Sequence, residues 1–326
     1  MLFIRALASL KFSFTLLLAL LLALLIAYNF EQSFLYWLIL PFVLLVLNLA
    51  AAIVCNKKFQ ANIPLLFFHL SLLATVVLAG LSRLTYLDGR VSLHEGGLFD
   101  GKLHDVKQGL WHQYNLSPGM FSLEAVELAF TNFIAITDIK TRIRLYAEEK
   151  PVRELVIGEH KPLVINNYRF YSTSNIGYSA VLSWQNIDQL DRFDIATGSI
   201  NFPPYLINEF SQTNTWQVPN SERQLWFMLS PDNDLLTEQK AMKLTPPKYH
   251  SLVIRDGEQR YSLRVGEQLK LAEGVLTYQG LRTWAGFSVH YEPFKAYLLA
   301  SSLLSVFCLS WFYWQRFNRR SWLDKL

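Results

Sequence analysis

One ionisable side chain, His69, stands inside a long apolar stretch of this sequence. The stretch runs from Ile63 to Leu81 and holds no other titratable residue. Crossing a bilayer takes about 20 such residues, and burying an ionisable group in hydrocarbon costs on the order of 2–3 kcal/mol or more. A neutral imidazole in a dry site is a good ligand for haem iron. His69 is therefore a candidate metal ligand; the alternative is a neutral histidine that only hydrogen-bonds a neighbouring helix.

Asn48 lies in a second apolar stretch, at a depth similar to that of His69. Both residues are expected about 8–10 Å from the same end of their helices, at a rise of about 1.5 Å per residue. If the two helices are antiparallel neighbours, the Asn48 amide can hold one ring nitrogen of His69 and leave the other nitrogen for a metal. The alternative is an Asn–His hydrogen bond that only packs the helices, worth about 0.6 kcal/mol.

The rest of the sequence carries no recognisable catalytic motif. It has no G-x-S-x-G, no P-loop and no dinucleotide fingerprint, so we expect no catalytic residues. Ser301 and Ser305 are expected to be small packing residues of a helix. Of the remaining histidines, His290 is closest to the last apolar stretch and has the best claim to a second role near the membrane. None has metal-binding spacing, and we expect structural or solvated roles for them: His94, His104, His112, His160, His250 and His290.

Composition excludes several classes of protein. Hydrophobic residues make up 52% and charged residues 17% of the chain, which indicates a membrane protein because the apolar residues are clustered. Two cysteines, Cys55 and Cys308, exclude a disulfide-stapled scaffold and a C-x-x-C redox pair. The net charge of +4 gives no sign of nucleic-acid binding.

Four apolar stretches predict four transmembrane helices. The first is longer than the apolar core of a signal peptide, roughly 7–15 residues, and lacks a good cleavage site, so we expect it to be retained. The predicted spans are 12–28, 34–54, 63–81 and 294–314.

Positive charges predict the orientation. The turn between the first two spans has no Lys or Arg, whereas the other side carries Arg5, Lys11, Lys57, Lys58 and the basic tail 315–326. The positive-inside rule then places both termini in the cytoplasm and the segment 82–293 outside.

The external segment 82–293 reads as a mostly β domain. Short β-branched or aromatic runs alternate with turn signals, of which Asp256-Gly257 is the clearest hairpin and Asn166-Asn167 another turn. Asp191–Asn220 lacks periodicity and is expected to be a long loop or a short helical insertion. The predicted strands are 141–146, 152–157, 163–171, 178–184, 250–255, 260–265, 275–279 and 286–291.

Several segments, in order, resemble the ResB/CcsB family, the membrane-anchored subunit of system II cytochrome c biogenesis. The layout of three helices, an external domain and a last helix is similar, and the resemblance spans essentially the whole chain, as a short variant. The matching segments are Leu7–Lys11 before the first helix, Phe68–Gly97 (FHLSLLATVVLAGLSRLTYLDGRVSLHEGG), Leu163–Gly177 (LVINNYRFYSTSNIG) and Tyr278–Leu299 (YQGLRTWAGFSVHYEPFKAYLL).

The resemblance implies a function. It implies an accessory, haem-handling subunit, non-catalytic by itself, that works with a polytopic CcsA/ResC-type partner to carry haem across the bacterial cytoplasmic membrane and attach it to apocytochrome c. His69 matches the family's axial ligand to haem b, so the only metal expected is haem iron. The implied contacts are the CcsA/ResC-like protein, apocytochrome c and membrane lipid.

The same sequence features bear on two other functions. A membrane-tethered sensory or scaffolding domain without cofactor explains the helices and the β domain equally well, and it makes His69 a packing residue. A transporter is disfavoured because the helices show no discontinuous or inverted-repeat pattern.

Overall fold

The computed structural model describes residues 7–29, 35–131, 135–147, 150–186, 196–203, 212–219, 221–232 and 244–319. The chain divides into two compact units. The helical unit comprises Met1–Tyr86, Gln108–His112 and Glu292–Leu326. The β unit comprises Leu87–Lys107 and Gln113–Tyr291.

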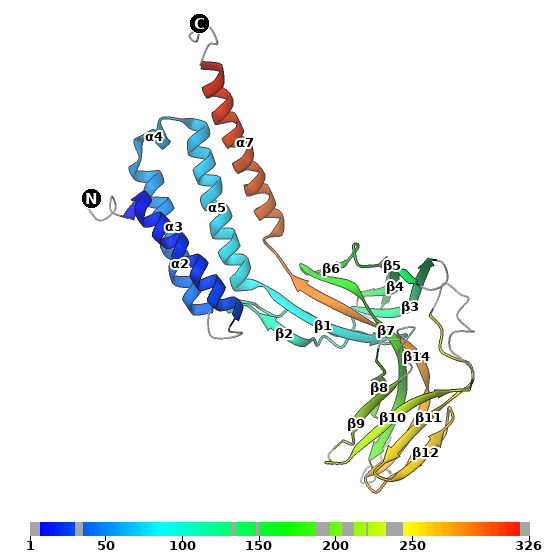
Figure 1. Cartoon of the computed structure of the whole chain (residues 1–326). Helices are drawn as coiled ribbons and strands as arrows, with labels where there is room; N and C mark the ends of the chain where they lie inside the picture. Colours follow the sequence, from blue (N-terminus) through cyan, green and yellow to red (C-terminus); the bar gives the residue numbers. More distant parts are fainter. Residues whose placement is uncertain are drawn as a thin grey trace. The chain divides into compact units, whose positions relative to one another are not determined.

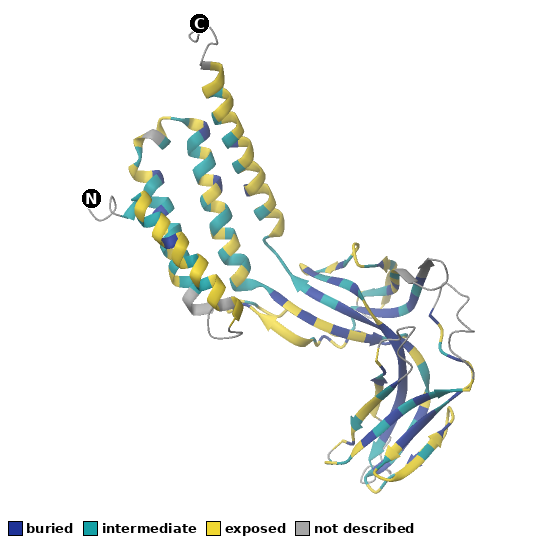
Figure 2. Ribbon diagram, viewed as in Figure 1, coloured by how far each residue is buried: buried dark blue, intermediate teal, exposed yellow. Residues whose placement is uncertain are grey.

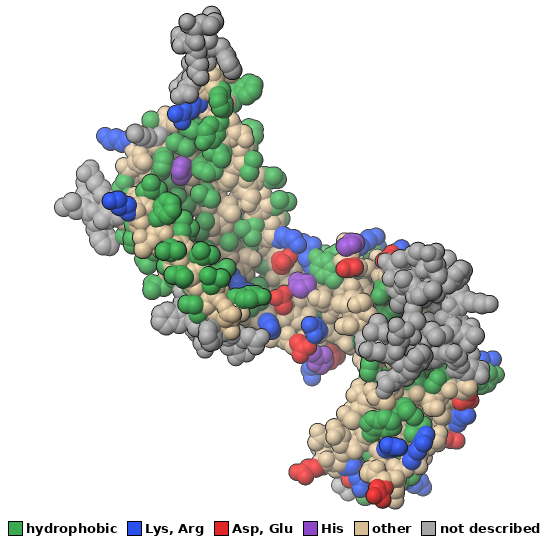
Figure 3. Space-filling view, in the orientation of Figure 1, with side chains coloured by type: hydrophobic (Ala, Val, Ile, Leu, Met, Phe, Trp, Pro, Cys, Tyr) green, Lys and Arg blue, Asp and Glu red, His purple; other side chains and the backbone are tan. Residues whose placement is uncertain are grey.

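The described helices of the helical unit are four long, apolar helices and one short polar turn, α4 (Figure 1). They are α2 (Leu10–Asn29), α3 (Leu35–Cys55), α4 (Lys57–Gln60), α5 (Ile63–Thr85) and α7 (Lys295–Arg319). Large hydrophobic side chains are exposed along them, as Figure 2 and Figure 3 show. In water such a surface would be unfavourable, so these helices fit a lipid environment.

Three of these helices are long and apolar enough to cross a membrane. The spans are Leu38–Cys55, Ile63–Thr85 and Lys295–Asn318, in agreement with three of the four predicted spans. The apolar part of α2, Leu10–Ile26, falls below that length. The fourth span and the topology stay predictions.

Hydroxyl side chains join α5 to α7. The Ser71 and Ser305 hydroxyl oxygens are 2.8 Å apart, and the Thr75 hydroxyl donates to the Ser301 hydroxyl at 2.9 Å. Ser71 and Ser301 are buried. Small polar residues let helices approach closely in lipid, so the packing role predicted for Ser301 and Ser305 is confirmed.

The segment Gln108–His112 closes the end of α5. Trp111 N–H donates to the Leu84 carbonyl and Gly109 N–H to the Tyr86 carbonyl, both at 2.8 Å. Carbonyl groups at a helix end have no partner within the helix, and this segment supplies one. A Cβ atom at Gly109 would lie 2.2 Å from the Leu84 oxygen, so glycine is needed for this close approach.

The described strands of the β unit form three antiparallel sheets. The largest has the order β2-β1-β14-β7-β6, with β13 on β14 and β8 on β7; the others are β12-β11-β10-β9 and β3-β4-β5. The strands are β1 (Leu87–His94), β2 (His104–Gln108), β3 (Phe121–Thr131), β4 (Ala135–Ala147), β5 (Lys150–Ile157), β6 (Leu163–Ile165), β7 (Tyr168–Asn186), β8 (Ala196–Asn201), β9 (Thr213–Gln217), β10 (Gln224–Pro231), β11 (His250–Asp256), β12 (Gln259–Leu263), β13 (Gln268–Lys270) and β14 (Gly274–Tyr291).

The long strands β7 and β14 pair with each other inside the largest sheet of the β unit. They pair from Gly274↔Asn186 to Tyr291↔Tyr168, with two register shifts. Residues alternate between a buried face and a more exposed face along the first part of β7, as expected for an antiparallel sheet with one solvated face. The buried side packs aromatic rings: Phe121 lies 5.1 Å from Phe170 and 6.3 Å from Phe287, between ring centroids.

The structure confirms the mostly β character and several predicted strands and turns. The strands expected at 141–146, 152–157 and 250–255 lie within β4, β5 and β11. Asn166 and Asn167 both adopt positive φ, 50° and 67°, between β6 and β7, which is typical of a tight hairpin turn. Asp256 pairs with Gln259 across the hairpin that Gly257 turns at φ 60°.

The prediction of a loop or helical insertion over Asp191–Asn220 is wrong where the structure describes it. β8 and β9 both fall within this range. Their sequences, ATGSIN and TNTWQ, carry no apolar alternation because most of their side chains are exposed or half-buried. Backbone pairing to β7 and β10 holds them instead. The residues 187–195 and 204–211 lie outside the described part.

Candidate functional site

His69 is anchored on α5 with one ring nitrogen unused. Its Nδ1 lies 2.7 Å from the Leu65 carbonyl oxygen, one helical turn earlier. Because a carbonyl only accepts, Nδ1 carries the hydrogen, and the neutral ring keeps a lone pair on Nε2. Within the described residues no hydrogen bond to Nε2 is found.

Two aromatic rings fix the imidazole. Phe59 stacks on His69 with centroids 3.9 Å apart and planes at 24°, and Phe68 meets it edge-on at 5.1 Å. Phe59 belongs to the single turn α4 that returns the chain from α3 to α5. The imidazole is therefore held on one side by its own helix and on one face by the preceding turn.

The local sequence explains this arrangement. Pro64 lies in the first turn of α5, where its missing N–H is not needed. The Gln60 amide donates to the Val54 carbonyl at 2.9 Å, which ties α4 to the end of α3. Phe59 is not among the residues predicted from the sequence, because its contact with His69 depends on how α4 folds back against α5.

A lone anchored imidazole suits one kind of metal site. In the described part of the chain no group of three or more His, Cys, Asp or Glu side chains is placed to hold a metal ion. A bare ion would need such a group, whereas haem iron brings its porphyrin ligands and takes one or two axial residues. The donor set around His69 therefore fits haem.

Asn48 is buried, but its hydrogen bonds go to the start of α2 rather than to His69. Ser13 donates to the Asn48 amide oxygen at 2.7 Å, and the amide nitrogen donates to the carbonyls of Leu7 and Ser9. Depth alone suggested α5 as its neighbour, yet the carbonyls of the residues just before α2 and the Ser13 hydroxyl in its first turn take the amide. A role for Asn48 in orienting His69 has no support in these contacts.

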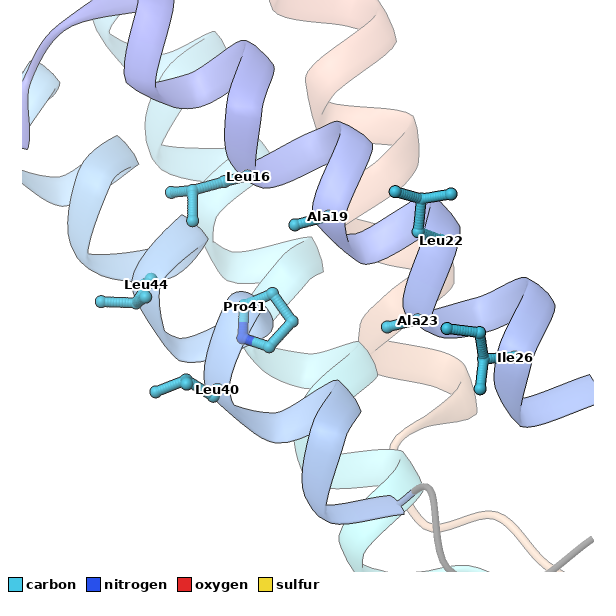
Figure 4. A pocket seen from close by; sticks show the side chains of 8 residues that line it. All are labelled: Leu16, Ala19, Leu22, Ala23, Ile26, Leu40, Pro41 and Leu44. Atoms are coloured by element: carbon cyan, nitrogen blue, oxygen red, sulfur yellow. The ribbon is translucent and has the colours of Figure 1, made fainter. Parts of the chain in front are cut away.

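An apolar hollow lies between α2 and α3 (Figure 4). It measures about 600 Å³. Its walls are hydrocarbon, so nothing orients a polar ligand there, and His69 is not among them. The lining residues are Leu16, Ala19, Leu22, Ala23, Ile26, Leu40, Pro41 and Leu44.

The histidines of the β unit differ in environment. His250 is buried, and its ring nitrogens bond the Pro247 carbonyl at 2.8 Å and the Tyr278 hydroxyl at 2.7 Å. Burial lowers the pKa of His250 and raises the pKa of Tyr278. His250 is thus a core residue, whereas His104 and His160 are exposed.

His290 has ordered polar partners. Its Nδ1 lies 2.6 Å from Asp88 Oδ1 and its Nε2 2.8 Å from the Ser288 hydroxyl. Asp88 and His290 are opposite each other in the register of β1 and β14. Long-range strand pairing creates this contact, so no sequence spacing could have predicted it.

Comparison with known proteins identifies the family. The ResB-like family model matches residues 50–325. A solved structure named "Cytochrome c Heme Lyase CcmF" aligns at 11% identity and a TM-score of 0.28; the alignment covers 92% of this chain and 34% of that one, so this chain spans about a third of its length. No curated protein sequence matches this chain. Since the family model covers most of the sequence, the chain belongs to the ResB-like family, and its apolar helices identify it as a membrane protein.

Proposed function

We propose that this chain is the haem-handling accessory subunit of a system II cytochrome c synthase. It works with a CcsA/ResC-type membrane partner, delivers haem across the bacterial cytoplasmic membrane and takes part in its attachment to apocytochrome c. Membership of the ResB-like family supports a role in cytochrome c biogenesis.

The observation that carries this proposal is the state of His69. An imidazole within an apolar helix has its Nδ1–H bonded to the Leu65 carbonyl and its Nε2 left as an available donor to a metal. A histidine kept only for packing is expected to bond a neighbouring helix, worth about 0.6 kcal/mol. His69 bonds its own helix instead, which favours ligation over packing.

Each part of the chain has a task in this proposal. His69 holds haem iron through Nε2, the Leu65 carbonyl fixes the ring tautomer, and Phe59 limits ring rotation. The hydroxyl contacts between α5 and α7 hold these two helices, which precede and follow the β unit in the sequence, in register with each other. Haem is the cargo, and groups of the partner would complete the coordination of its iron.

We also propose the orientation. Both termini are cytoplasmic, α2 is the fourth span, and the β unit lies on the periplasmic side, where it meets apocytochrome c. The turn between the first two apolar stretches has no Lys or Arg, whereas the other ends of these stretches carry basic residues. This distribution supports the proposed orientation.

The test is a reduced-minus-oxidised absorption spectrum of the chain co-expressed with a CcsA-type partner and purified in mild detergent. We expect a b-type haem spectrum that His69→Ala removes or strongly weakens. His160→Ala, at an exposed histidine of the β unit, is the matched control and should leave the spectrum unchanged. Equal haem content with and without His69 would refute the assignment. A folded wild-type chain that forms no complex and holds no haem would favour a tethered domain without cofactor.

A further inference from the structure

A tight turn at the carboxyl end of α5 carries two large apolar side chains at its tip. The turn spans Gly109–His112, and the His112 N–H closes it by donating to the Gly109 carbonyl at 3.1 Å. Leu110 and Trp111 occupy its two central positions and are 53% and 61% exposed. Gly, Pro, Asn, Asp and Ser dominate such positions in turns that face water. Two large apolar residues at the tip therefore indicate a turn with other surroundings.

Hydrogen bonds fix this turn to the end of the helix. Its donors are the backbone N–H groups of Gly109 and Trp111, both at 2.8 Å, and the ring Nδ1–H of His112 at 2.9 Å. The turn and the helix belong to the same compact unit. Its position along α5 is thus set by the fold. The acceptors are three consecutive carbonyls, those of Leu84, Thr85 and Tyr86.

The length of α5 places this turn at the edge of a bilayer. The helix has 23 residues, so it is about 34 Å long at about 1.5 Å per residue. The hydrocarbon core of a bilayer is about 30 Å thick, and a helix of this length that crosses it ends in the headgroup region. Because the turn is bonded to the last carbonyls, Leu110 and Trp111 are expected at that depth.

Two residues near the end of α5 have the chemistry of a membrane interface. Arg83 is exposed, and its guanidinium carbon lies 4.3 Å from the centre of the Tyr86 ring. Trp and Tyr are enriched where membrane meets water, because an apolar ring with a polar edge suits the headgroup region. Long Arg side chains near helix ends extend to the same region. The turn therefore continues the lipid-facing surface of α5 and adds a cation beside it.

Docking of a protein at this turn is less favoured. A specific protein interface covers roughly 800 Å² on each side, whereas Gly109–His112 is a single tight turn. It is also bonded to the end of a membrane helix, at a depth where phospholipid is the surrounding medium. An apolar tip next to a guanidinium group matches phospholipid, which offers acyl chains and phosphate within a short distance.

We propose that Gly109–His112 is an interfacial membrane anchor. Leu110 and Trp111 insert into the phospholipid headgroup region at the carboxyl end of α5, and Arg83 meets lipid phosphate. The turn thereby adds a membrane contact that lies outside the apolar helices. This inference depends on the membrane character of the helices and not on haem.

The experiment measures the depth of a spin label at the tip of the turn. The full chain, with Cys55→Ser and Cys308→Ala, carries a nitroxide on Leu110→Cys in nanodiscs of phosphatidylethanolamine and phosphatidylglycerol. Electron paramagnetic resonance power saturation reports collisions with oxygen, which concentrates in lipid, and with a neutral nickel chelate, which stays in water. The references are Leu303→Cys, at an exposed position of α7, and Glu159→Cys, at an exposed position of the β unit. We expect an oxygen-to-chelate ratio at position 110 between those at positions 303 and 159.

Variants at position 111 test whether the tryptophan holds the turn in lipid. Trp111→Asp should shift the ratio at position 110 to the value at position 159, because a carboxylate is expelled from the interface, whereas Trp111→Phe should keep it. Tyr249→Asp removes another exposed aromatic residue, 55% exposed, and is the matched control that should leave the ratio unchanged. A label at position 303 that keeps its ratio in Trp111→Asp shows that the helices stay in the bilayer.

Each contrary outcome is distinct. A ratio at position 110 equal to that at position 159 would place the turn in water and overturn the proposal. Weak collision with both reagents would mean that protein covers the turn, which would also overturn it. A ratio that Trp111→Asp leaves unchanged would refute anchoring by Trp111. None of these results touches the His69-dependent haem spectrum, so the proposed function stands or falls separately.

Discussion

At the residue scale, two histidines with the same Nδ1 bonding differ at the second ring nitrogen. His69 and His250 each donate Nδ1–H to a backbone carbonyl. In His250 the second nitrogen is taken by the Tyr278 hydroxyl inside the core, whereas in His69 it is not engaged by any described residue. What decides between a structural histidine and a ligand is thus the second nitrogen, which sequence alone does not reveal.

The buried His250 predicts a pH dependence of stability. Burial disfavours its charged form and lowers its pKa below the ordinary value of about 6.5; the Pro247 carbonyl and Asp232 oppose this with smaller effects, and the Arg264 charge adds to it. The unfolded chain therefore binds this proton more readily. The contribution of His250 to stability is complete above about pH 6.5 and is lost progressively as pH falls below that value.

Melting temperatures of the full chain in detergent at pH 8 and pH 5 test this dependence. We expect His250→Gln to be less stable than wild type at pH 8 and to lose less stability on acidification. His160→Ala, at an exposed site, should follow wild type at both values. If the melting temperatures of wild type and His250→Gln change equally between pH 8 and pH 5, His250 is not the source of the pH dependence.

At the scale of elements, the helical unit is assembled by polar contacts within apolar surroundings. Ser71 and Thr75 of α5 meet Ser305 and Ser301 of α7, although the chain between these helices is the whole β unit. The hydroxyl spacing of four residues on each helix was visible in the sequence, but the partner helix was not, because helix pairing depends on tertiary packing.

Cysteine crosslinking tests the pairing of α5 with α7. In a background of Cys55→Ser and Cys308→Ala, the pair Ser71→Cys and Ser305→Cys should form a disulfide on mild oxidation, since the two hydroxyl oxygens are 2.8 Å apart. The matched control is the pair Ser71→Cys and Ser310→Cys, because Ser310 lies at an exposed position of α7. This pair should not form a disulfide. After the chain is cleaved by a protease within the β unit, a disulfide keeps the two fragments together on a non-reducing gel. Equal amounts of linked fragments for both cysteine pairs would refute the register of α5 against α7.

At the scale of the whole molecule, the number of membrane crossings decides where the ends of the chain lie. With three crossings, by α3, α5 and α7, the two termini are on opposite sides; with α2 as a fourth, they are on the same side. The apolar part of α2 is shorter than the other spans, and the basic residues near both termini favour the second arrangement.

Labelling of single cysteines in spheroplasts with a membrane-impermeant maleimide settles the count. In the same cysteine-free background, Ala6→Cys and Ser321→Cys should both be protected, and Glu159→Cys in the β unit should react. Permeabilised cells, in which all three positions react, provide the control. Labelling at position 6 together with protection at position 321 would show that α2 does not cross.

Local patterns predicted the three long spans, the β character and the turns at Asn166-Asn167 and Gly257. They did not predict the sheets, because β7 pairs with β14 across nearly the whole unit and β8 and β9 carry no apolar alternation. The same limit applies to the site: His69 stood out by its type and surroundings, whereas Phe59 beside it and Asp88 beside His290 are products of folding.

The most direct test of the central claim, that His69 Nε2 binds haem iron, is chemical rescue. The complex of the His69→Gly chain with its CcsA-type partner is titrated with imidazole while the reduced absorption spectrum is recorded. We predict that the b-type bands absent from the variant return with added imidazole and that wild type does not respond. A variant spectrum that already equals wild type, or one that imidazole leaves unchanged while the complex stays assembled and haem is supplied, would contradict ligation by His69.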